Sequence, residues 1–552
     1  MFKLKRPYTR FLSIFLIVFL FVIFIYGFEH LLSFPANDEY NLRLLNIIFN
    51  EIKEKYVEEI DESSLIKLGI DGMLEGFDPY TDFYDSKRLS QLNSITTGKY
   101  GGIGFYISMI DSEFTLISPL EDSPAIDAGI RQGDVIIRVD GIETKGMNIG
   151  DVTDVIKGEE GTVVMLAIKR RGLPSPIEIP VTRRSILLKD VAYSKMLDNH
   201  IGYIKLNHFS QNASGDIYKA VRELQKSGLN GLILDVRGNQ GGLLSSAVKV
   251  VDLFVEKEEL IVSTKGRNEE FSSNHISRRN AIYSNKPLVV MVDHSSASAS
   301  EILAGAIQDL DRGVVVGKKT FGKGLVQTVF YPTPNTALKM TTARYYTPSG
   351  RCIDGTKISS AKEINNKENI YYTKSGRVVH GGGGITPDIV VSDDGGHVSE
   401  LLRQSVFLKF AIDYAIKHYG MQKVDVDDEI LVQFMEFVSA GGFGSGKKGL
   451  EEVEKLIEMG SEENYGREYE KHINRLREII TEKNRLELDL SDPHIAYNLR
   501  DRMNWVLMGE RGKLEATIDD DIYIKEAINI FNQKERYNQL LKNINVSKHS
   551  LK

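Results

Sequence analysis

"PLVVMVDHSSASASEILAGAIQDL", residues 287–310, leads from a continuous apolar run through small hydroxyl residues into a helical pattern. The run at 288–292 indicates a buried strand, and the spacing of apolar residues after Glu301 indicates a helix. Ser298-x-x-Glu301 matches a capping box, the ordinary reason for serine at a helix start. A strand-to-helix turn can also present a nucleophile beside free N–H groups and the positive end of the helix dipole.

The same kind of pattern surrounds this stretch. Apolar runs at 201–206, 231–235 and 313–317 alternate with helical patterns at 214–228 and 243–255. Continuous apolar strands between helices are typical of a buried sheet. We therefore expect an α/β layer from about residue 185 onwards.

The bulk composition describes a globular chain of several domains. The 552 residues are 42% hydrophobic and carry a net charge of −7. The sequence therefore lacks the excess of basic residues that is typical of nucleic-acid-binding proteins. A single cysteine, Cys352, excludes an internal disulfide and a cysteine-based metal site, and we interpret it as a structural thiol.

The N-terminus carries an uncharged stretch, Phe11–Phe28, preceded by basic residues and followed by Glu29. As a helix it would reach about 27 Å, close to the roughly 30 Å of a bilayer core. The flanking charges predict a cytoplasmic tail and an extracytoplasmic remainder. A cleaved signal peptide is the alternative, although the run exceeds the usual apolar region of about 7–15 residues.

Changes of pattern divide the chain into five segments. We expect a tail and transmembrane anchor at 1–36, a helical segment at 37–95, a β-rich module at 96–172, the α/β layer at 173–398 and a charged helical region at 399–552. The last region contains no chemical motif, and its charged faces are interpreted as solvated helix surfaces.

"KYGGIGFYI" (99–107) precedes "SPLEDSPAIDAGIRQGDVIIRVDGIET" (118–144). Together they resemble the PDZ domain of bacterial proteases. In that arrangement Gly102, Ile103, Gly104 and Phe105 would expose successive N–H groups to a substrate's terminal carboxylate, and the strand edge beside them would pair with the peptide. The alternative is a plain cluster of turn glycines.

"KKTFGKGLVQ" (318–327) places Lys323 between two glycines in an apolar context. Burial there would lower the pKa of the amine, and a neutral amine could accept the proton of a serine. Histidine remains an alternative base, either His294 beside Asp293 or His208. The sequence lacks the G-x-S-x-G and H-E-x-x-H motifs of two other hydrolase classes.

Taken with "DPYTDFY", "IGYIKLNHFS", "LILDVRGNQGGLLSSAV", "ARYYTPSGR" and "GITPDIVV", these stretches resemble the carboxy-terminal processing proteases, also called tail-specific proteases, over roughly residues 40–391. The resemblance implies a crotonase/ClpP-like α/β protease core with an inserted PDZ domain. It implies Ser298 as nucleophile, Lys323 as base and Gln327 as the residue that orients the base. Asp309 would be structurally important.

The resemblance further implies an oxyanion hole of main-chain amides. Ala299 would supply one, and a glycine of the turn at 238–242 the other. We favour Gly241 or Gly242 over Gly238, with Arg237 bracing the turn. Lys157 stands where relatives often carry a basic residue that could relay ligand capture by the PDZ domain.

The sequence thus predicts a membrane-anchored serine endopeptidase of the bacterial inner membrane with its catalytic domain in the periplasm. It would bind protein or peptide substrates with free, apolar C-termini, without nucleic acid, metal or cofactor, and a homo-oligomer is compatible with it. The alternatives are an inactive PDZ adaptor and a crotonase-like acyl transferase, which would need a coenzyme A site.

Overall fold

A computed structural model describes residues 36–542, apart from 87, 90–91, 93–96, 121, 285, 356–368, 393–397, 441–446, 464 and 484–490. The chain divides into two units, 1–83 and 84–552. The stretch expected to form the anchor, 11–28, lies outside the described residues. Among the described residues, no helix combines the length and apolar character needed to span a membrane.

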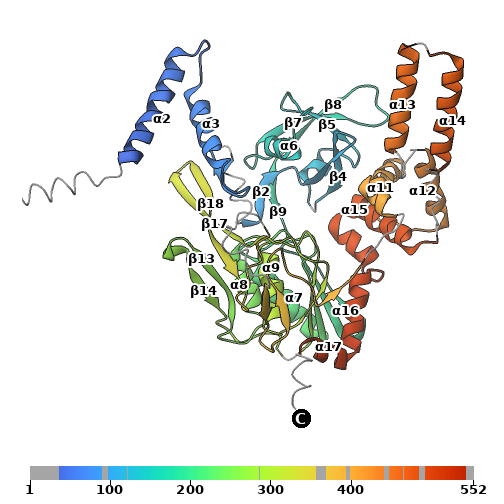
Figure 1. The fold of residues 1–552 in the computed structure, drawn as a ribbon. Helices are drawn as coiled ribbons and strands as arrows, with labels where there is room; N and C mark the ends of the chain where they lie inside the picture. Colours follow the sequence, from blue (N-terminus) through green and yellow to red (C-terminus); the bar gives the residue numbers. More distant parts are fainter. Residues whose placement is uncertain are drawn as a thin grey trace, which may run out of the picture. The chain divides into compact units, whose positions relative to one another are not determined.

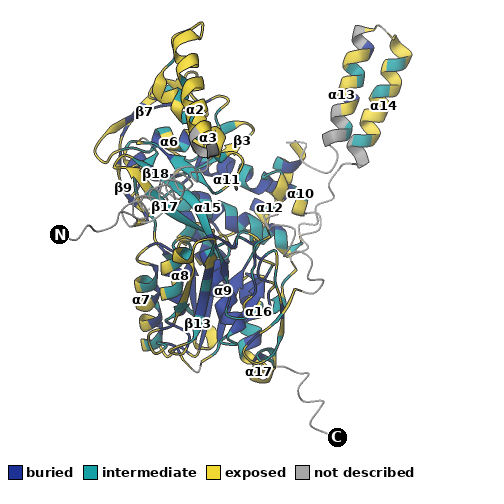
Figure 2. Cartoon of the chain, turned by 60° about the vertical axis from the view of Figure 1, so that its left-hand side comes forward, coloured by how far each residue is buried: buried dark blue, intermediate teal, exposed yellow. Residues whose placement is uncertain are grey.

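In the described part of the first unit, residues 36–83, there are two helices, α2 (Ala36–Lys55) and α3 (Glu62–Leu74). Asp61 caps α3 by accepting a hydrogen bond of 2.8 Å from the N–H of Ser64. Both helices are largely exposed in Figure 2 and present apolar side chains to solvent, among them Leu42 and Leu68. β1 (Asp82–Tyr84) follows at the boundary of the units.

The second unit begins with a β-rich domain, labelled by β4, β5, β7 and β8 in Figure 1. Its sheet has the order β3-β4-β5-β7-β8, with β6 beside β5. Its elements are β2 (Lys99–Gly102), β3 (Phe105–Ile110), β4 (Glu113–Pro119), α5 (Pro124–Asp127), β5 (Val135–Val139), β6 (Ile142–Glu143), α6 (Ile149–Ile156), β7 (Val163–Lys169), β8 (Ile177–Thr182) and β9 (Arg184–Leu187). Because β8 pairs with β7, this domain extends past residue 172, where the sequence pattern had placed its end. β2 and β9 pair and form its connection to the next domain.

The expected α/β layer is present as a six-stranded sheet in the order β10-β11-β12-β15-β16-β21, parallel except for β10. Its elements are β10 (Val191–Leu197), β11 (Ile201–Leu206), α7 (Ala213–Lys226), β12 (Gly231–Asp235), α8 (Leu244–Val251), β15 (Leu288–Val292), α9 (Ala299–Asp309), β16 (Val314–Gly317) and β21 (Ile389–Val390). A second, antiparallel sheet contains β13 (Leu260–Gly266), β14 (Ser273–Ile276), β17 (Leu325–Thr333) and β18 (Thr336–Tyr346), and β19 (Ile370–Tyr372) pairs with β20 (Val378–His380).

Alternate residues of the parallel strands face two separate cores. Leu232 and Leu234 of β12 pack with α7, α8 and α9, and all eleven residues of α9 are buried (Figure 2). Ile233 faces the opposite side, where Ile524 and Ala527 of the C-terminal helices cover the sheet. Part of the C-terminal region therefore belongs to the α/β core, which the charged pattern of its sequence did not predict.

The C-terminal region also packs on the β-rich domain. Its helices are α10 (Val398–Arg403), α11 (Val406–Lys417), α12 (Asp428–Ala440), α13 (Lys447–Glu462), α14 (Arg467–Lys483), α15 (Pro493–Thr517), α16 (Ile522–Asn532) and α17 (Lys534–Leu540). Helix α15 bends at Gly509, whose φ is 71°. Before the bend, the carbonyl of Trp505 accepts a hydrogen bond of 2.6 Å from Ser118 of β4, and after it the helix leads to α16.

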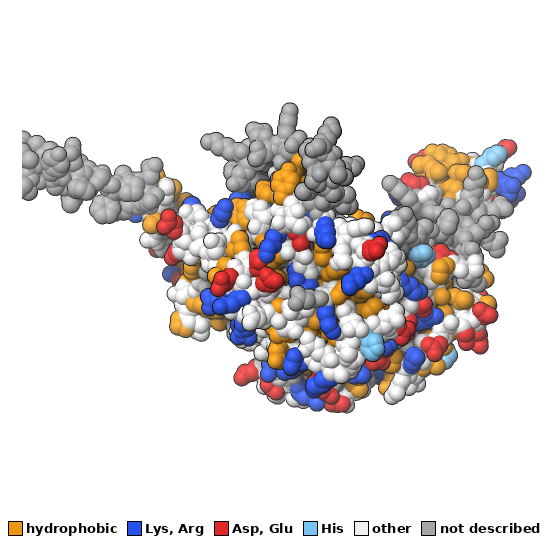
Figure 3. Space-filling model, turned by 90° about the horizontal axis from the view of Figure 1, so that it is seen from below, with side chains coloured by type: hydrophobic (Ala, Val, Ile, Leu, Met, Phe, Trp, Pro, Cys, Tyr) orange, Lys and Arg blue, Asp and Glu red, His pale blue; other side chains and the backbone are white. Residues whose placement is uncertain are grey.

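The surface carries charges of both signs. On the face drawn in Figure 3, Lys and Arg side chains alternate with Asp and Glu side chains among the described residues. This mixture agrees with the small net charge of −7.

Candidate active site

Ser298 lies between β15 and α9 in a conformation that few residues with a side chain adopt. Its φ is 55° and its ψ is −112°, and the residue is half-buried. Non-glycine residues at positive φ persist where the surroundings hold them, and they concentrate at functional sites. This strained conformation indicates that the turn positions the side chain of Ser298 for a functional role.

The carboxylate of Glu301 joins the main chains of Ser298 and Lys323. One oxygen accepts the N–H of Ser298 at 2.8 Å and that of Lys323 at 2.9 Å. The other accepts the hydroxyl of Thr320 at 2.6 Å and the N–H of Gly322 at 2.7 Å. Burial raises the pKa of Glu301, and these four hydrogen bonds oppose that shift.

Tyr345 of β18 makes a second link between the same two residues. Its hydroxyl lies 2.5 Å from the carbonyl oxygen of Lys323 and 3.2 Å from that of Ser298. The ring is 1% exposed, so the link is held in the core. Glu301 and Tyr345 therefore each bridge the main chains of Ser298 and Lys323.

Gln327 lies in β17, and its amide donates to the hydroxyl of Thr341 at 3.2 Å. Asp309, at the end of α9, is buried against Arg351, with 2.7 Å between the carboxylate and the guanidinium. Thus Asp309 ties α9 to the segment after β18. Cys352 follows Arg351 and is half-buried, and its main chain forms an isolated β-bridge with that of Tyr346.

The glycine turn at 238–242 lies against Ser298. A side chain on Gly241 would place its Cβ 2.9 Å from the Cβ of Ser298 and 2.9 Å from the nitrogen of Ala299. The N–H of Gly241 donates to the side chain of Asn239 at 2.8 Å. Among the described residues, nothing accepts a hydrogen bond from the N–H of Ala299 or of Gly242.

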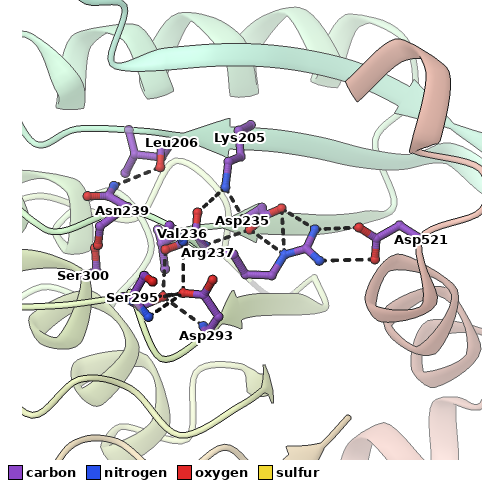
Figure 4. A network of polar contacts seen from close by, with 12 residues as sticks. Lys205, Leu206, Asp235, Val236, Arg237, Asn239, Asp293, Ser295, Ser300 and Asp521 are labelled. Atoms are coloured by element: carbon purple, nitrogen blue, oxygen red, sulfur yellow. Dashed lines mark hydrogen bonds and ion pairs between the residues drawn. The ribbon is translucent and has the colours of Figure 1, made fainter. Parts of the chain in front are cut away.

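Two further contacts attach this turn to the serine loop. The carbonyl of Asn239 accepts hydrogen bonds from the N–H of Ala297 at 3.1 Å and from the hydroxyl of Ser300 at 2.8 Å. It therefore binds residues that precede and follow Ser298. The carboxylate of Asp293 accepts the N–H of Gly238 at 3.0 Å (Figure 4). Glycine is needed at 241 because of this close approach and its φ of 105°.

A cluster of charged groups supports the start of the turn. Arg237 contacts Asp235 at 2.7 Å and Asp521 of the C-terminal region at 2.8 Å (Figure 4). Lys205 lies 3.4 Å from Asp235 and also donates to the carbonyl of Arg237. Burial alone would raise the pKa of Asp235, but the charges of Arg237 and Lys205 outweigh it and hold the pKa below its usual value.

The two histidine alternatives lie elsewhere in this region. His294 is exposed, while Asp293 is engaged by the glycine turn and by the N–H groups of Ser295 and Ser296 at 3.0 Å. Burial lowers the pKa of His208, which lines a cavity of about 450 Å³ together with Arg237 and Asp521. The described residues lining that cavity do not include Ser298.

The expected carboxylate-binding loop lies between β2 and β3. Gly102 ends β2, Phe105 begins β3, and Gly104 has a φ of 71°. Among the described residues, nothing accepts a hydrogen bond from the N–H of Ile103 or Gly104. β3 lies at an edge of its sheet, and it packs in one core with α6, so a peptide strand could pair there. Lys157, at the end of α6, lies over the ring of Tyr100 at 5.3 Å.

Sequence reasoning found Glu301 only as a helix cap and did not single out Tyr345 or Asp521. The S-x-x-E pattern was a usable signal for Glu301, but nothing local indicates that the carboxylate also binds Lys323. Asp521 precedes the apolar pattern of α16 as an N-cap would, and its contact with Arg237 spans 284 residues.

Three segments match known domain families. Residues 200–364 match peptidase family S41, residues 117–170 match the PDZ domain, and residues 398–531 match "Probable PDZ-protease, C-terminal helical domain".

Whole proteins and solved structures are similar as well. The chain is 36% identical to the carboxy-terminal-processing protease of Bartonella bacilliformis, over 59% of this chain and 76% of that protein. It is 34% identical to the carboxy-terminal processing protease CtpA of Bacillus subtilis, over 56% and 66%. A solved structure titled photosystem II D1 C-terminal processing protease is 28% identical, covering 63% of this chain and 86% of that one, with a TM-score of 0.39.

Proposed function

This chain belongs to the carboxy-terminal processing proteases of peptidase family S41, and we propose that Ser298 and Lys323 form its catalytic dyad. It is a serine protease with a PDZ domain. The observation that carries the proposal is the double link between Ser298 and Lys323, through the carboxylate of Glu301 and the hydroxyl of Tyr345. The positive φ of Ser298 supports its role as the presented nucleophile.

In the proposed reaction, the neutral amine of Lys323 accepts the hydroxyl proton as the oxygen of Ser298 attacks the scissile carbonyl carbon. The tetrahedral intermediate then collapses: the C–N bond breaks, and Lys323 returns the proton to the leaving amine. Water hydrolyses the resulting ester, with Lys323 again as the base. Gln327 orients the lysine.

The oxyanion of the intermediate is proposed to bind the N–H groups of Ala299 and Gly242. Both lack another acceptor among the described residues, whereas the N–H of Gly241 donates to Asn239. This favours Gly242 as donor and gives Gly241 the role of allowing close approach. The loss of one such donor commonly costs about 2.7–4 kcal/mol of transition-state stabilisation.

The PDZ domain is proposed to capture the free C-terminus of a substrate at Gly102–Phe105. The available N–H groups of Ile103 and Gly104 suit a carboxylate, and the edge of β3 suits an extended apolar tail. Cleavage then occurs upstream of the captured terminus. The apolar stretch at 11–28 is proposed to anchor the protein in the inner membrane, with the catalytic domain in the periplasm.

The test is cleavage of an unstructured polypeptide with an apolar C-terminus by the wild type, Ser298→Ala and Lys323→Ala. Both variants are expected to be inactive while retaining the fold by circular dichroism. Cleavage that survives either substitution contradicts the dyad. Amidation of the substrate's C-terminus is expected to slow cleavage, and cleavage insensitive to amidation contradicts the PDZ role.

A further inference from the structure

The guanidinium of Arg237 is held between two carboxylates from distant parts of the chain. Asp235, at the end of β12, receives Nε and Nη2. Asp521 receives Nη1 at 3.3 Å and Nη2 at 2.8 Å, a two-point contact (Figure 4). The Asp521 side chain is 8% exposed and that of Arg237 is 17% exposed. A largely buried, two-point contact fixes the direction of a guanidinium as well as its charge.

Asp521 is itself fixed by the start of α16. The same carboxylate caps this helix by accepting the N–H groups of Tyr523 at 2.8 Å and Ile524 at 3.2 Å. The ring of Tyr523 lies 4.8 Å from the guanidinium carbon of Arg237. Residues of α16 pack on one face of the sheet. Asp521 is therefore attached to a helix that is fixed to the protein core.

Arg237 begins the turn that ends against Ser298. Two residues after Arg237, the carbonyl of Asn239 accepts hydrogen bonds from Ala297 and Ser300. Gly241 lies against Ser298 itself. A shift of Arg237 therefore moves the main chain that carries the proposed oxyanion donor Gly242. Displacements of about 1 Å in such a group can cost about 100-fold in rate.

Asp521 is one of two carboxylates that contact the buried cations of this cluster. Without it, Arg237 and Lys205 would share Asp235 as their contacting carboxylate. The adjoining cavity of about 450 Å³ is lined by charges of both signs: Lys318, Lys513, Asp293, Asp501 and Glu510. The guanidinium would then gain by turning towards solvent in the cavity.

We propose that Asp521 is a positioning residue for peptide-bond hydrolysis, acting through Arg237 on the turn at 238–242. It makes proteolysis depend on the C-terminal helical region, whose Tyr523 also contacts Arg237. This inference rests on the proposed dyad and oxyanion turn.

The test compares Asp521→Asn with Asp520→Asn in the full-length protein. Asparagine caps a helix about as well as aspartate, so Asp521→Asn keeps α16 and removes the charge on Arg237. Asp520, the neighbouring carboxylate, contacts Arg500 and Lys525 at the surface and is the matched control. We expect kcat to fall by about 10- to 100-fold with KM unchanged for Asp521→Asn. Asp520→Asn should match the wild type, and Asp521→Glu, which keeps the charge, should recover part of the loss.

A double-mutant cycle separates positioning from general stability. If Asp521 acts through Arg237, Asp521→Asn has no further effect on kcat in an Arg237→Gln background. Wild-type kcat in Asp521→Asn overturns the inference, as does an equal further loss in the Arg237→Gln background. Ser298→Ala is measured alongside: activity in that variant contradicts the proposed function, whereas an inactive Ser298→Ala with an unaffected Asp521→Asn contradicts only the role of Asp521.

Discussion

Gly241→Ala should disable the protease through one added methyl group. The new Cβ would lie 2.9 Å from the Cβ of Ser298 and 2.7 Å from the carbonyl oxygen of Ala297, where ordinary contacts are 3.4–4 Å. Either the turn or the serine must therefore move by several tenths of an ångström. Because a displacement of about 1 Å can cost about 100-fold, we expect kcat to fall by roughly 10- to 100-fold.

Gly238→Ala is the matched control in the same turn. Gly238 also has a positive φ, 72°, but a Cβ there meets nothing within 4 Å. Each substitution imposes backbone strain of about 1–3 kcal/mol, which urea denaturation measures. Activity, measured as cleavage of an unstructured polypeptide, should separate the two variants, with Gly238→Ala staying within about threefold of the wild type. Equal activity of the two variants would refute the close approach of Gly241 to Ser298.

Three other substitutions test separate parts of the structure. Glu301→Gln offers one acceptor oxygen to four donors, so we expect a loss of about 2–4 kcal/mol in the free energy of unfolding and a fall in kcat. Because burial raises the pKa of Glu301, its contribution to the free energy of unfolding is full below pH 4.5, the ordinary pKa, and is lost as the pH rises through the raised pKa. Urea denaturation at several pH values should show this fall in the wild type and not in Glu301→Gln. Arg351→Met leaves Asp309 buried without its cation and should cost about 3–5 kcal/mol, seen as a lower Tm; an unchanged Tm would contradict the pairing. Gly104→Val adds a Cβ about 3.1 Å from Ile186 at a φ of 71°. A fluorescence titration should show that a peptide with a free C-terminus binds at least about tenfold more weakly. A short peptide without a free C-terminus should be cleaved at the wild-type rate.

Local pattern predicted those parts of the fold that depend on neighbouring residues. The apolar run 201–206 is β11, and the stretch after Ser298 is helix α9, because strand and helix burial impose periods that a sequence displays. Gly104 and Gly241 were singled out for their main-chain N–H groups, whereas their positive φ angles became evident only in the structure.

Contacts between distant segments could not be predicted in this way. The sequence pattern indicated solvated charged faces for the C-terminal helices, but it did not indicate that Ile524 and Ala527 cover one face of the sheet. The sequence shows that α16 has an apolar face, but it does not show which surface of the protein that face covers. The contacts of Asp521 with Arg237 and of Glu301 with Lys323 likewise depend on how the whole chain folds.

The most direct test of the dyad is the rate at which Ser298 is acylated, followed by intact mass and peptide mapping after mixing with a peptidyl ester. We predict a single acyl group on Ser298 in the wild type, formed faster as the pH rises between about 6 and 9 because the base must be neutral. In Lys323→Met we predict no acyl-enzyme across that range. Acylation of Ser298 in Lys323→Met at the wild-type rate, or of any other residue in the wild type, would contradict the account.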